Sequence, residues 1–165
     1  MKPKIYTILF LLGILWFACN TPKDLAPPVP IFNANDLVGN WKLVAGSADI
    51  GGGAIVIPDI FDRTNTLLQA DTSGFCSKGA VLSLLAGGTF RETSDCYQVV
   101  ANKTFAGVYT FRQEAAAFAL SYPPETKIEQ RVYRITTLNT KEMKVNFSST
   151  RAGITFISKL TYQKL

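Results

Sequence analysis

The residues that could do chemistry in this chain are few, and their types exclude the commonest catalytic arrangements. The 165-residue sequence has no histidine, so neither a Ser-His-Asp nor a Cys-His arrangement can form. Its acidic residues are scattered, and no spacing pairs two carboxylates, although folding could still bring two together. We therefore expect that the protein is not an enzyme and that it binds no metal and no cofactor. The acidic residues considered are Glu92, Asp95, Glu114, Glu125, Glu129 and Glu142.

Two of the three cysteines flank a predicted hairpin. Residues 78–85 are rich in apolar side chains, residues 86–88 form a Gly-rich turn, and residues 89–95 return. Cys76 and Cys96 lie equally far from the turn, and paired strands place such residues opposite each other, close enough for a disulfide. We predict that bond, which an oxidising compartment permits. The alternatives are two free thiols or a pair of metal ligands. A metal site would need further ligands, and the domain has no other Cys and no His to supply them.

The third cysteine, Cys19, follows an export-type leader. Lys2 and Lys4 precede an uncharged, mostly apolar run over residues 5–18, which is shorter than the roughly 20 residues of a transmembrane helix. Ala18 directly before the cysteine resembles the lipobox of bacterial lipoproteins, although bulky residues precede it. A secreted protein with an early cysteine and an uncleaved anchor are the alternatives.

These features divide the chain into three parts. Residues 1–18 are a predicted signal peptide, and residues 19–35 are a lipidated Cys19, carrying palmitate, with a Pro-rich, extended tether. Residues 36–165 form one domain. By resemblance to bacterial lipoproteins, the residue after Cys19, Asn20, favours the outer membrane of the cell envelope, so a membrane is the expected partner.

The charge of the chain gives no support for nucleic-acid binding. The formal net charge is +5, and removal of Lys2 and Lys4 with the leader lowers it to +3. The basic residues are scattered and form no cluster. We expect a monomer.

The first strand of the domain is predicted from residues 36–44. Gly39, Trp41, Leu43 and Ala45 share one face of an alternating pattern, which is typical of a half-buried strand. A glycine near a buried tryptophan lets another backbone approach, and the indole can close one end of a barrel. Residues 47–75 follow as a long irregular segment, either a lid or an outer insertion.

The rest of the domain is a series of short alternating segments. They begin near residues 107, 118, 131, 143 and 154, are separated by turns, and contain no long helical pattern. About eight strands spaced by about ten residues indicate an all-β sandwich or barrel.

In order and spacing, these segments resemble the lipocalin-like lipoproteins of Bacteroidetes-type bacteria. The likeness runs from Leu37 to Leu165. It rests on four segments: the Gly39-x-Trp41 strand, the segment from Cys76 through Gly88-Thr89-Phe90, the later strand pair from Tyr133 to Val145, and the final strand that contains a tyrosine. Residues 47–75 depart from the compact family pattern. The resemblance implies an eight-stranded antiparallel up-and-down barrel, and lipocalins in general carry small apolar molecules.

Two functions follow from this fold. The barrel could bind or carry a small hydrophobic molecule, or it could be filled and serve as a structural or protein-interaction module of the envelope. An arginine inside the barrel could bind an acidic head group or cap Trp41, the candidates being Arg91, Arg131, Arg134 and Arg151. The predicted ligand-pocket residues are Trp41, Tyr109, Phe111, Phe118, Tyr133, Phe147 and Phe156.

Overall fold

A computed structural model describes residues 29–62, 78–94, 103–124, 130–151 and 153–165. In this part of the chain, one short helix and nine strands follow each other with little else. Their bounds are α2 (Ala34–Leu37), β1 (Gly39–Ile50), β2 (Ile55–Ile57), β3 (Val81–Leu84), β4 (Thr89–Ser94), β5 (Lys103–Arg112), β6 (Ala117–Ser121), β7 (Arg131–Leu138), β8 (Glu142–Arg151) and β9 (Ile154–Lys164), with a 3-10 turn, η1, at Gln113–Ala115.

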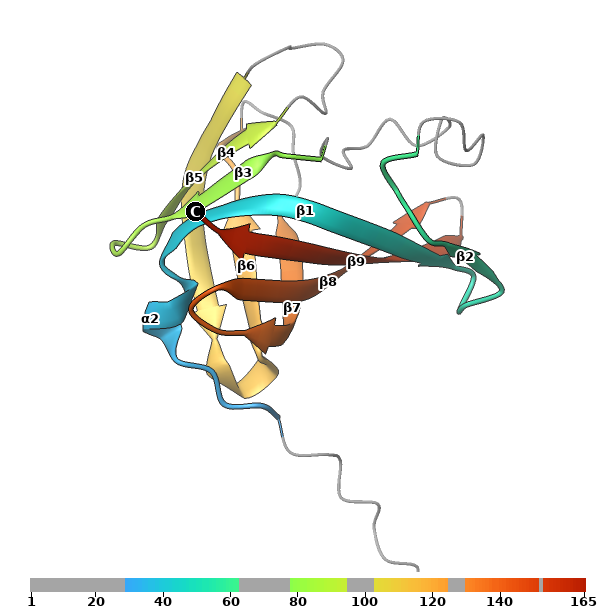
Figure 1. Cartoon of the computed structure of the whole chain (residues 1–165), viewed down its shortest axis with the longest axis horizontal. Coiled ribbons are helices and arrows are strands. Elements are labelled where there is room, and N and C mark those ends of the chain that lie inside the picture. The colour runs from blue at the N-terminus through green and yellow to red at the C-terminus, as the bar shows by residue number, and fades with distance from the viewer. Residues whose placement is uncertain (1–28, 63–77, 95–102, 125–129, 152) are drawn as a thin grey trace, which may run out of the picture.

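The strands form a closed antiparallel barrel with one additional strand. From β3 to β9 each strand pairs with the next one along the chain, β1 pairs with β3, and β9 returns to pair with β1. Eight strands, β1 and β3 to β9, therefore close the up-and-down barrel that the sequence predicts, and β2 adds to the outer part of β1 (Figure 1). Closure leaves no free edge among these eight strands.

The barrel has two different ends. We call the end that carries α2 and the C-terminus the base (Figure 1). The turns that join β3 to β4, β5 to β6, and β7 to β8 also lie at the base. The opposite end, which we call the far end, carries the turn between β1 and β2.

Strand β1 serves both barrel and extension. Gly39–Lys42 pairs with β3, whereas Ala48–Ile50 pairs with β2, and β9 follows β1 along both parts. The prediction of an irregular segment from residue 47 is therefore wrong as far as Ile57. Gly51, Gly52 and Gly53 all have positive φ and make the turn between β1 and β2, a backbone conformation that side-chain-bearing residues rarely adopt.

A β-bulge changes the face that β1 presents to the core. Leu43 lies opposite Tyr162 and Ala45 lies opposite Thr161, so Val44 has no partner of its own in this ladder. An extra residue reverses the alternation beyond it. Ala45, predicted to share the face of Trp41, is exposed, and Ala48 and Ile50 continue the buried face instead.

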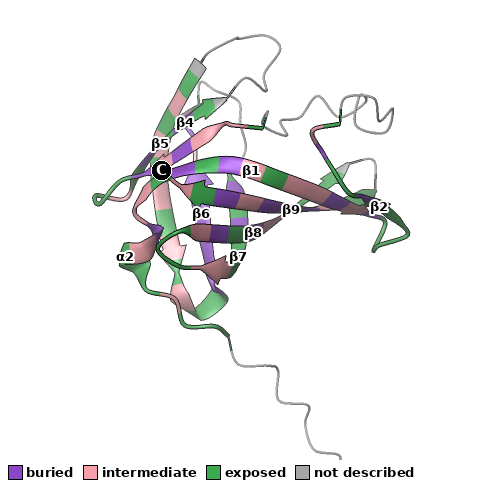
Figure 2. Ribbon diagram, in the orientation of Figure 1, coloured by how far each residue is buried: buried purple, intermediate pink, exposed green. Residues whose placement is uncertain are grey.

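The core fills the barrel along its inner faces. In Figure 2, buried and exposed residues alternate along the strands, as expected for a sheet with one face exposed to solvent. The largest fully buried side chains come from nearly every wall: Trp41, Phe90, Phe118, Leu37, Leu43, Ile57, Leu84, Leu120, Ile135, Met143 and Val145.

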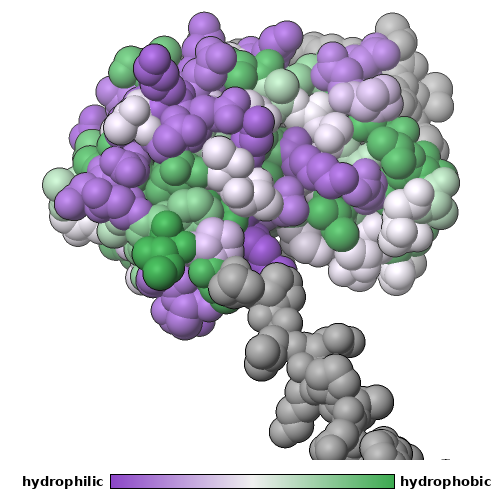
Figure 3. Space-filling model, turned by 60° about the horizontal axis from the view of Figure 1, so that its bottom comes forward, coloured by the Kyte–Doolittle hydropathy of each residue, from purple (hydrophilic) through white to green (hydrophobic). Residues whose placement is uncertain are grey.

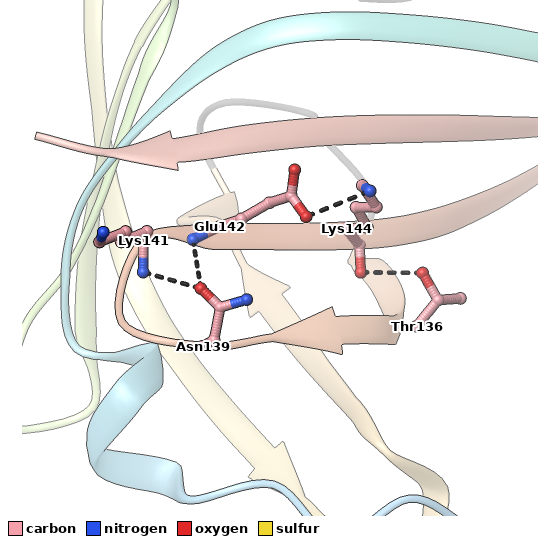
Figure 4. A network of polar contacts seen from close by, with 5 residues as sticks. All are labelled: Thr136, Asn139, Lys141, Glu142 and Lys144. Atoms are coloured by element: carbon pink, nitrogen blue, oxygen red, sulfur yellow. Dashed lines mark hydrogen bonds and ion pairs between the residues drawn. The ribbon is translucent and has the colours of Figure 1, made fainter.

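The turn between β7 and β8 is fixed by a single side chain. Oδ1 of Asn139 accepts hydrogen bonds from the backbone N–H groups of Lys141 and Glu142, at 2.9 and 2.8 Å (Figure 4). Asparagine favours such turns because its side chain can replace a backbone acceptor. The Thr136 hydroxyl on β7 donates a hydrogen bond to the carbonyl of Lys144 on β8. This contact lies at the second bulge of the barrel, where Ile135 pairs with Val145 and Thr137 pairs with Lys144.

The outer surface mixes polar and apolar residues, as Figure 3 shows for one face. In this view hydrophobic residues (green) lie among hydrophilic ones on both the left and the right of the molecule. Ile55 and Val56 of β2 and Ile154 of β9 are among the exposed hydrophobic residues. Within the described ranges, no helix has the length and apolar character needed to cross a membrane.

Candidate binding site

The base of the barrel is sealed by Trp41. Its side chain has no exposed surface, and its indole N–H donates to the carbonyl of Leu37 in α2 at 2.7 Å. The ammonium group of Lys164 lies 5.0 Å from the centre of the indole and donates to the carbonyl of Asp36 at 3.1 Å. The cation over Trp41 is thus Lys164, whereas the sequence analysis had considered an arginine for this place. Trp41 acts as a plug of the base.

An aromatic row crosses the barrel wall above this plug. Phe111, Phe118, Tyr133 and Phe147 lie opposite one another in register on β5, β6, β7 and β8. The rings of Phe118 and Tyr133 are stacked with centres 5.0 Å apart, and those of Tyr133 and Phe147 are 5.5 Å apart. The row continues to Ser158 on β9. The rings of Phe118, Tyr133 and Phe147 therefore form a continuous row along the inner wall.

The seven predicted pocket residues are all part of the core or packed against it, but they differ in exposure. Trp41, Phe118 and Tyr133 are buried, and the other four are partly exposed. Tyr109 points toward the base, where its hydroxyl donates to the carbonyl of Leu85 at 3.0 Å. Phe105, which the sequence analysis missed, is partly exposed in the far half, as are Phe147 and Phe156.

A buried polar cluster lies in the far half of the barrel. Glu92 on β4 and Arg131 on β7 are 4% and 8% exposed, respectively. The phenol of Tyr122 donates to Oε2 of Glu92 at 2.8 Å, and Nη1 of Arg131 lies 3.6 Å from the same oxygen. The guanidinium also lies over the ring of Tyr122, 5.3 Å from its centre. We call these three residues the Glu92 cluster.

Strand alternation places the cluster inside. Glu92 follows Phe90 by two residues and Arg131 precedes Tyr133 by two, so each shares the inner face of its strand with a buried aromatic residue. The ring of Phe90 packs edge-on against Tyr122, with centres 5.1 Å apart. A carboxylate and a guanidinium are therefore held in an apolar interior, where burial without a partner would be costly.

The surroundings of Tyr122 keep its phenol protonated. Burial raises its pKa well above the ordinary value near 10, and the neighbouring carboxylate of Glu92 raises it further. The positive charge of Arg131 acts in the opposite direction but does not prevail. The phenol therefore remains a hydrogen-bond donor to Glu92 over the whole physiological range.

The predicted arginines fall into different environments. Arg131 is buried, whereas Arg91 and Arg134 are exposed on the outer face, and the side chain of Arg151 lies outside the described residues. Glu92 had been considered only as one of several scattered acids. Its position two residues after a buried Phe90 is the signal that could have revealed it.

Ser158 is the second residue that sequence reasoning missed. It has no exposed surface, and its hydroxyl is the one buried side-chain polar atom without a hydrogen-bond partner among the described residues. It lies on the inner face of β9, between Ala48 of β1 and Phe147 of β8. Buried polar atoms are nearly always satisfied, so an exception calls for an explanation such as a ligand or a water molecule.

The fold is compatible with a binding barrel. It combines partly exposed aromatic rings with a few buried donors and acceptors, as small-molecule sites do. Within the described ranges, no three acidic or cysteine side chains are grouped as metal ligands. Cys19, Cys76 and Cys96 lie outside the described residues. Neither a scan of protein-family models nor a search of curated proteins finds a match for this chain.

Proposed function

We propose that this protein binds a small hydrophobic molecule with a polar end in the far half of its barrel. The observation that carries this proposal is the hydroxyl of Ser158, which is fully buried and lacks a partner. Such a group loses its hydration on folding and is compensated when a bound molecule supplies a hydrogen bond. Phe147, opposite Ser158, offers an apolar surface for the rest of that molecule.

The far half is the better location for the ligand because the base is filled. Trp41, Leu43 and Met143 are almost completely buried there, and Leu37 covers them from α2. Eight-stranded barrels are just wide enough to be filled by side chains or to hold one small ligand. The base follows the first pattern, and the polar groups of the far half favour the second.

A blocking substitution tests the location. We expect wild-type protein to bind N-phenyl-1-naphthylamine, an uncharged fluorescent probe, and Ser158→Phe to weaken that binding by about tenfold or more, because the added ring would occupy the inner face of β9. Ser148→Phe is the matched control, since Ser148 is exposed on the neighbouring strand. Thermal unfolding verifies that both variants are folded. Unchanged binding by Ser158→Phe contradicts the proposed site.

We also propose that the barrel is a lipoprotein of the lipocalin-like kind, anchored in the outer membrane through Cys19. The export leader and the cysteine that follows it support this. Expression of the full chain with labelled palmitate should give a labelled, membrane-bound product. Cys19→Ser should be unlabelled and released from membranes, and a labelled, membrane-bound Cys19→Ser product would refute the assignment.

A structural or interaction role is the second candidate function, and one observation favours it. Ile55 and Val56 on β2 are exposed, at 46% and 62%. The exposed patch is smaller than residues 55–57 suggested, because Ile57 is buried. If this surface carries the function, Ile55→Ser with Val56→Ser will abolish a partner contact without changing probe uptake.

A further inference from the structure

We propose that the base of the barrel rests on an anionic lipid surface, at the side where the tether joins it. We call this side the tether-side surface, and it consists of Val29, Ile31, Arg112 and Arg134. The inference rests on the proposed anchoring through Cys19 and specifies which face of the barrel the anchor presents to the membrane. This orientation directs the far end, with the proposed binding site, away from the lipid.

The described end of the tether is held against the barrel. Nε2 of Gln113, in the 3-10 turn between β5 and β6, donates to the carbonyl of Pro30 at 3.2 Å. Two residues after Pro30, Phe32 packs against the core. The tether therefore joins the barrel beside the β5–β6 turn, at the bottom of Figure 1.

The tether limits the distance to the membrane but does not by itself set the orientation of the barrel. Cys19 precedes Val29 by ten residues, which span at most about 35 Å when fully extended. The 11 residues of β9 span about the same length. An anchored barrel could therefore touch the lipid with its base or with a side wall, and its exposed side chains must decide between them.

Exposed apolar side chains lie where the tether joins the base. Ile31, next to the residue that Gln113 holds, is 90% exposed, and Val29 is also exposed. Leu85, in the β3–β4 turn, and Leu165 are further exposed hydrophobic residues at the base. In Figure 3, where the bottom of Figure 1 comes forward, hydrophobic and hydrophilic residues lie side by side. Exposed apolar side chains beside a lipid-anchored segment fit a membrane surface.

Two arginines supply positive charge beside the same turn. Arg112 and Arg134 lie on either side of Ala117, in the first row of paired residues after the β5–β6 turn. Both are exposed, and neither side chain forms an ion pair or hydrogen bond with another residue of the described ranges. Their backbones are about 10 Å apart, two strand spacings, so both can reach neighbouring anionic head groups. Glu114 is the one acid of the turn, which leaves the row with a net positive charge.

Vesicle binding tests the tether-side surface. A chain beginning at Asn20 keeps every strand of the barrel and lacks Cys19, so its binding does not depend on lipidation. It should prefer vesicles of equal parts phosphatidylcholine and phosphatidylglycerol to vesicles of phosphatidylcholine alone. Arg112→Gln with Arg134→Gln should weaken binding to the anionic vesicles by about tenfold or more, because each cation near such a surface contributes about fivefold.

Lys78→Gln with Lys159→Gln is the matched control. It removes the same net charge from exposed positions farther along the barrel from the base, so it should weaken binding far less. Thermal unfolding verifies that all variants are folded. The inference is overturned if the wild-type chain does not prefer anionic vesicles, or if the two double variants lose binding equally.

A tryptophan reporter tests the orientation. Trp41 has no exposed surface, so a second tryptophan in the chain from Asn20 reports the surface that carries it. Ile31→Trp should be quenched by anionic vesicles that contain brominated phosphatidylcholine, because the base contacts the lipid. Val56→Trp, on β2 at the far end, is the matched control and should be quenched much less. Equal or stronger quenching of Val56→Trp would overturn the inference.

The outcomes separate this inference from the proposed anchoring. A labelled, membrane-bound Cys19→Ser product refutes the anchor, and the vesicle measurements then decide the surface on their own, since their chain lacks Cys19. If the anchor is confirmed but Arg112→Gln with Arg134→Gln binds anionic vesicles as the control does, the inference alone is wrong.

Discussion

The phenol of Tyr122 donates its proton to the carboxylate of Glu92 across 2.8 Å of barrel interior. The two residues come from β6's end and from β4, and Arg131 of β7 lies beside both. Side chains from β4, from β7 and from the residue that follows β6 therefore meet in one polar contact inside a largely apolar core. The contact makes stability depend on the ionisation of Tyr122.

We predict that stability falls at alkaline pH because of Tyr122. Its pKa is raised in the folded state, so above about pH 10 the unfolded chain loses the phenol proton while the folded chain keeps it. The unfolded state then binds fewer protons, and the free energy of unfolding falls as pH rises, by up to about 1.4 kcal/mol per pH unit. The contribution is fully present below that pH and is lost above it. Urea unfolding across this range measures it.

The matched variant is Tyr122→Phe. It should lower the free energy of unfolding at neutral pH by about 1–3 kcal/mol, because Glu92 loses a buried donor. It should also have a shallower decline above pH 10. Tyr109→Phe is the control, since the hydroxyl of this partly exposed tyrosine makes an exposed hydrogen bond to Leu85 and should matter less. A Tyr122→Phe protein with the pH profile of the wild type would contradict this assignment.

We predict that Lys164 stabilises the base of the barrel through Trp41. Lys164→Met preserves an unbranched side chain but loses both the cation over the indole and the hydrogen bond to Asp36. Contacts of this kind contribute about 0.5–2 kcal/mol, so a loss of about 1–2 kcal/mol is expected. Exposed Gln163→Met is the control. In a chain beginning at Asn20, Trp41 is the sole tryptophan, so its fluorescence reports unfolding directly. Equal stability of the two variants would show that the lysine contributes nothing.

We predict that Gly107 is required where β5 and β6 approach each other. An added Cβ would collide with the carbonyl oxygen of Ser121 and lie 2.7 Å from Cε1 of Phe90. Gly107→Ala should therefore lower the free energy of unfolding by about 1–3 kcal/mol or more. At Gly87 an added Cβ meets nothing within 4 Å, so Gly87→Ala should change it by no more than about 0.5 kcal/mol. Similar results at both positions would contradict this account.

The Cys76–Cys96 disulfide remains a prediction, because both cysteines lie outside the described residues. In the described hairpin Val81 lies opposite Thr93, so its residues pair about position 87 and not about position 86. Non-reducing peptide mapping of protein from an oxidising compartment should show one linked species, and free-thiol labelling of both cysteines would exclude the bond.

The sequence predicts the barrel well because its strands alternate regularly. The buried face of β7 follows directly from the spacing of Tyr133 and Ile135, whereas four consecutive residues of β6 are buried. The prediction fails after Val44, because a bulge is set by pairing with a distant strand and not by local composition. It also fails over residues 47–57, where Gly51, Gly52 and Gly53 form the turn of a hairpin that the sequence pattern did not indicate.

The candidate site could be predicted only in part. Aromatic residues at alternating positions identify an inner face, but their exposure depends on how opposite walls pack. Glu92 and Ser158 were missed because a polar residue on an inner face interrupts the apolar pattern. Arg131 was one candidate among four, and only the register of β7 distinguishes it. Contacts between strands distant in the sequence decide such sites.

Native mass spectrometry of residues 20–165, produced in an oxidising compartment, tests the central claim most directly. Binding in the far half of the barrel predicts a bound small molecule that is retained in the folded protein and lost on unfolding. Stripped protein should regain one equivalent of lauryl alcohol. A clean mass for the protein alone, with no uptake of any apolar probe, would contradict the claim and direct attention to the exposed surface of β2.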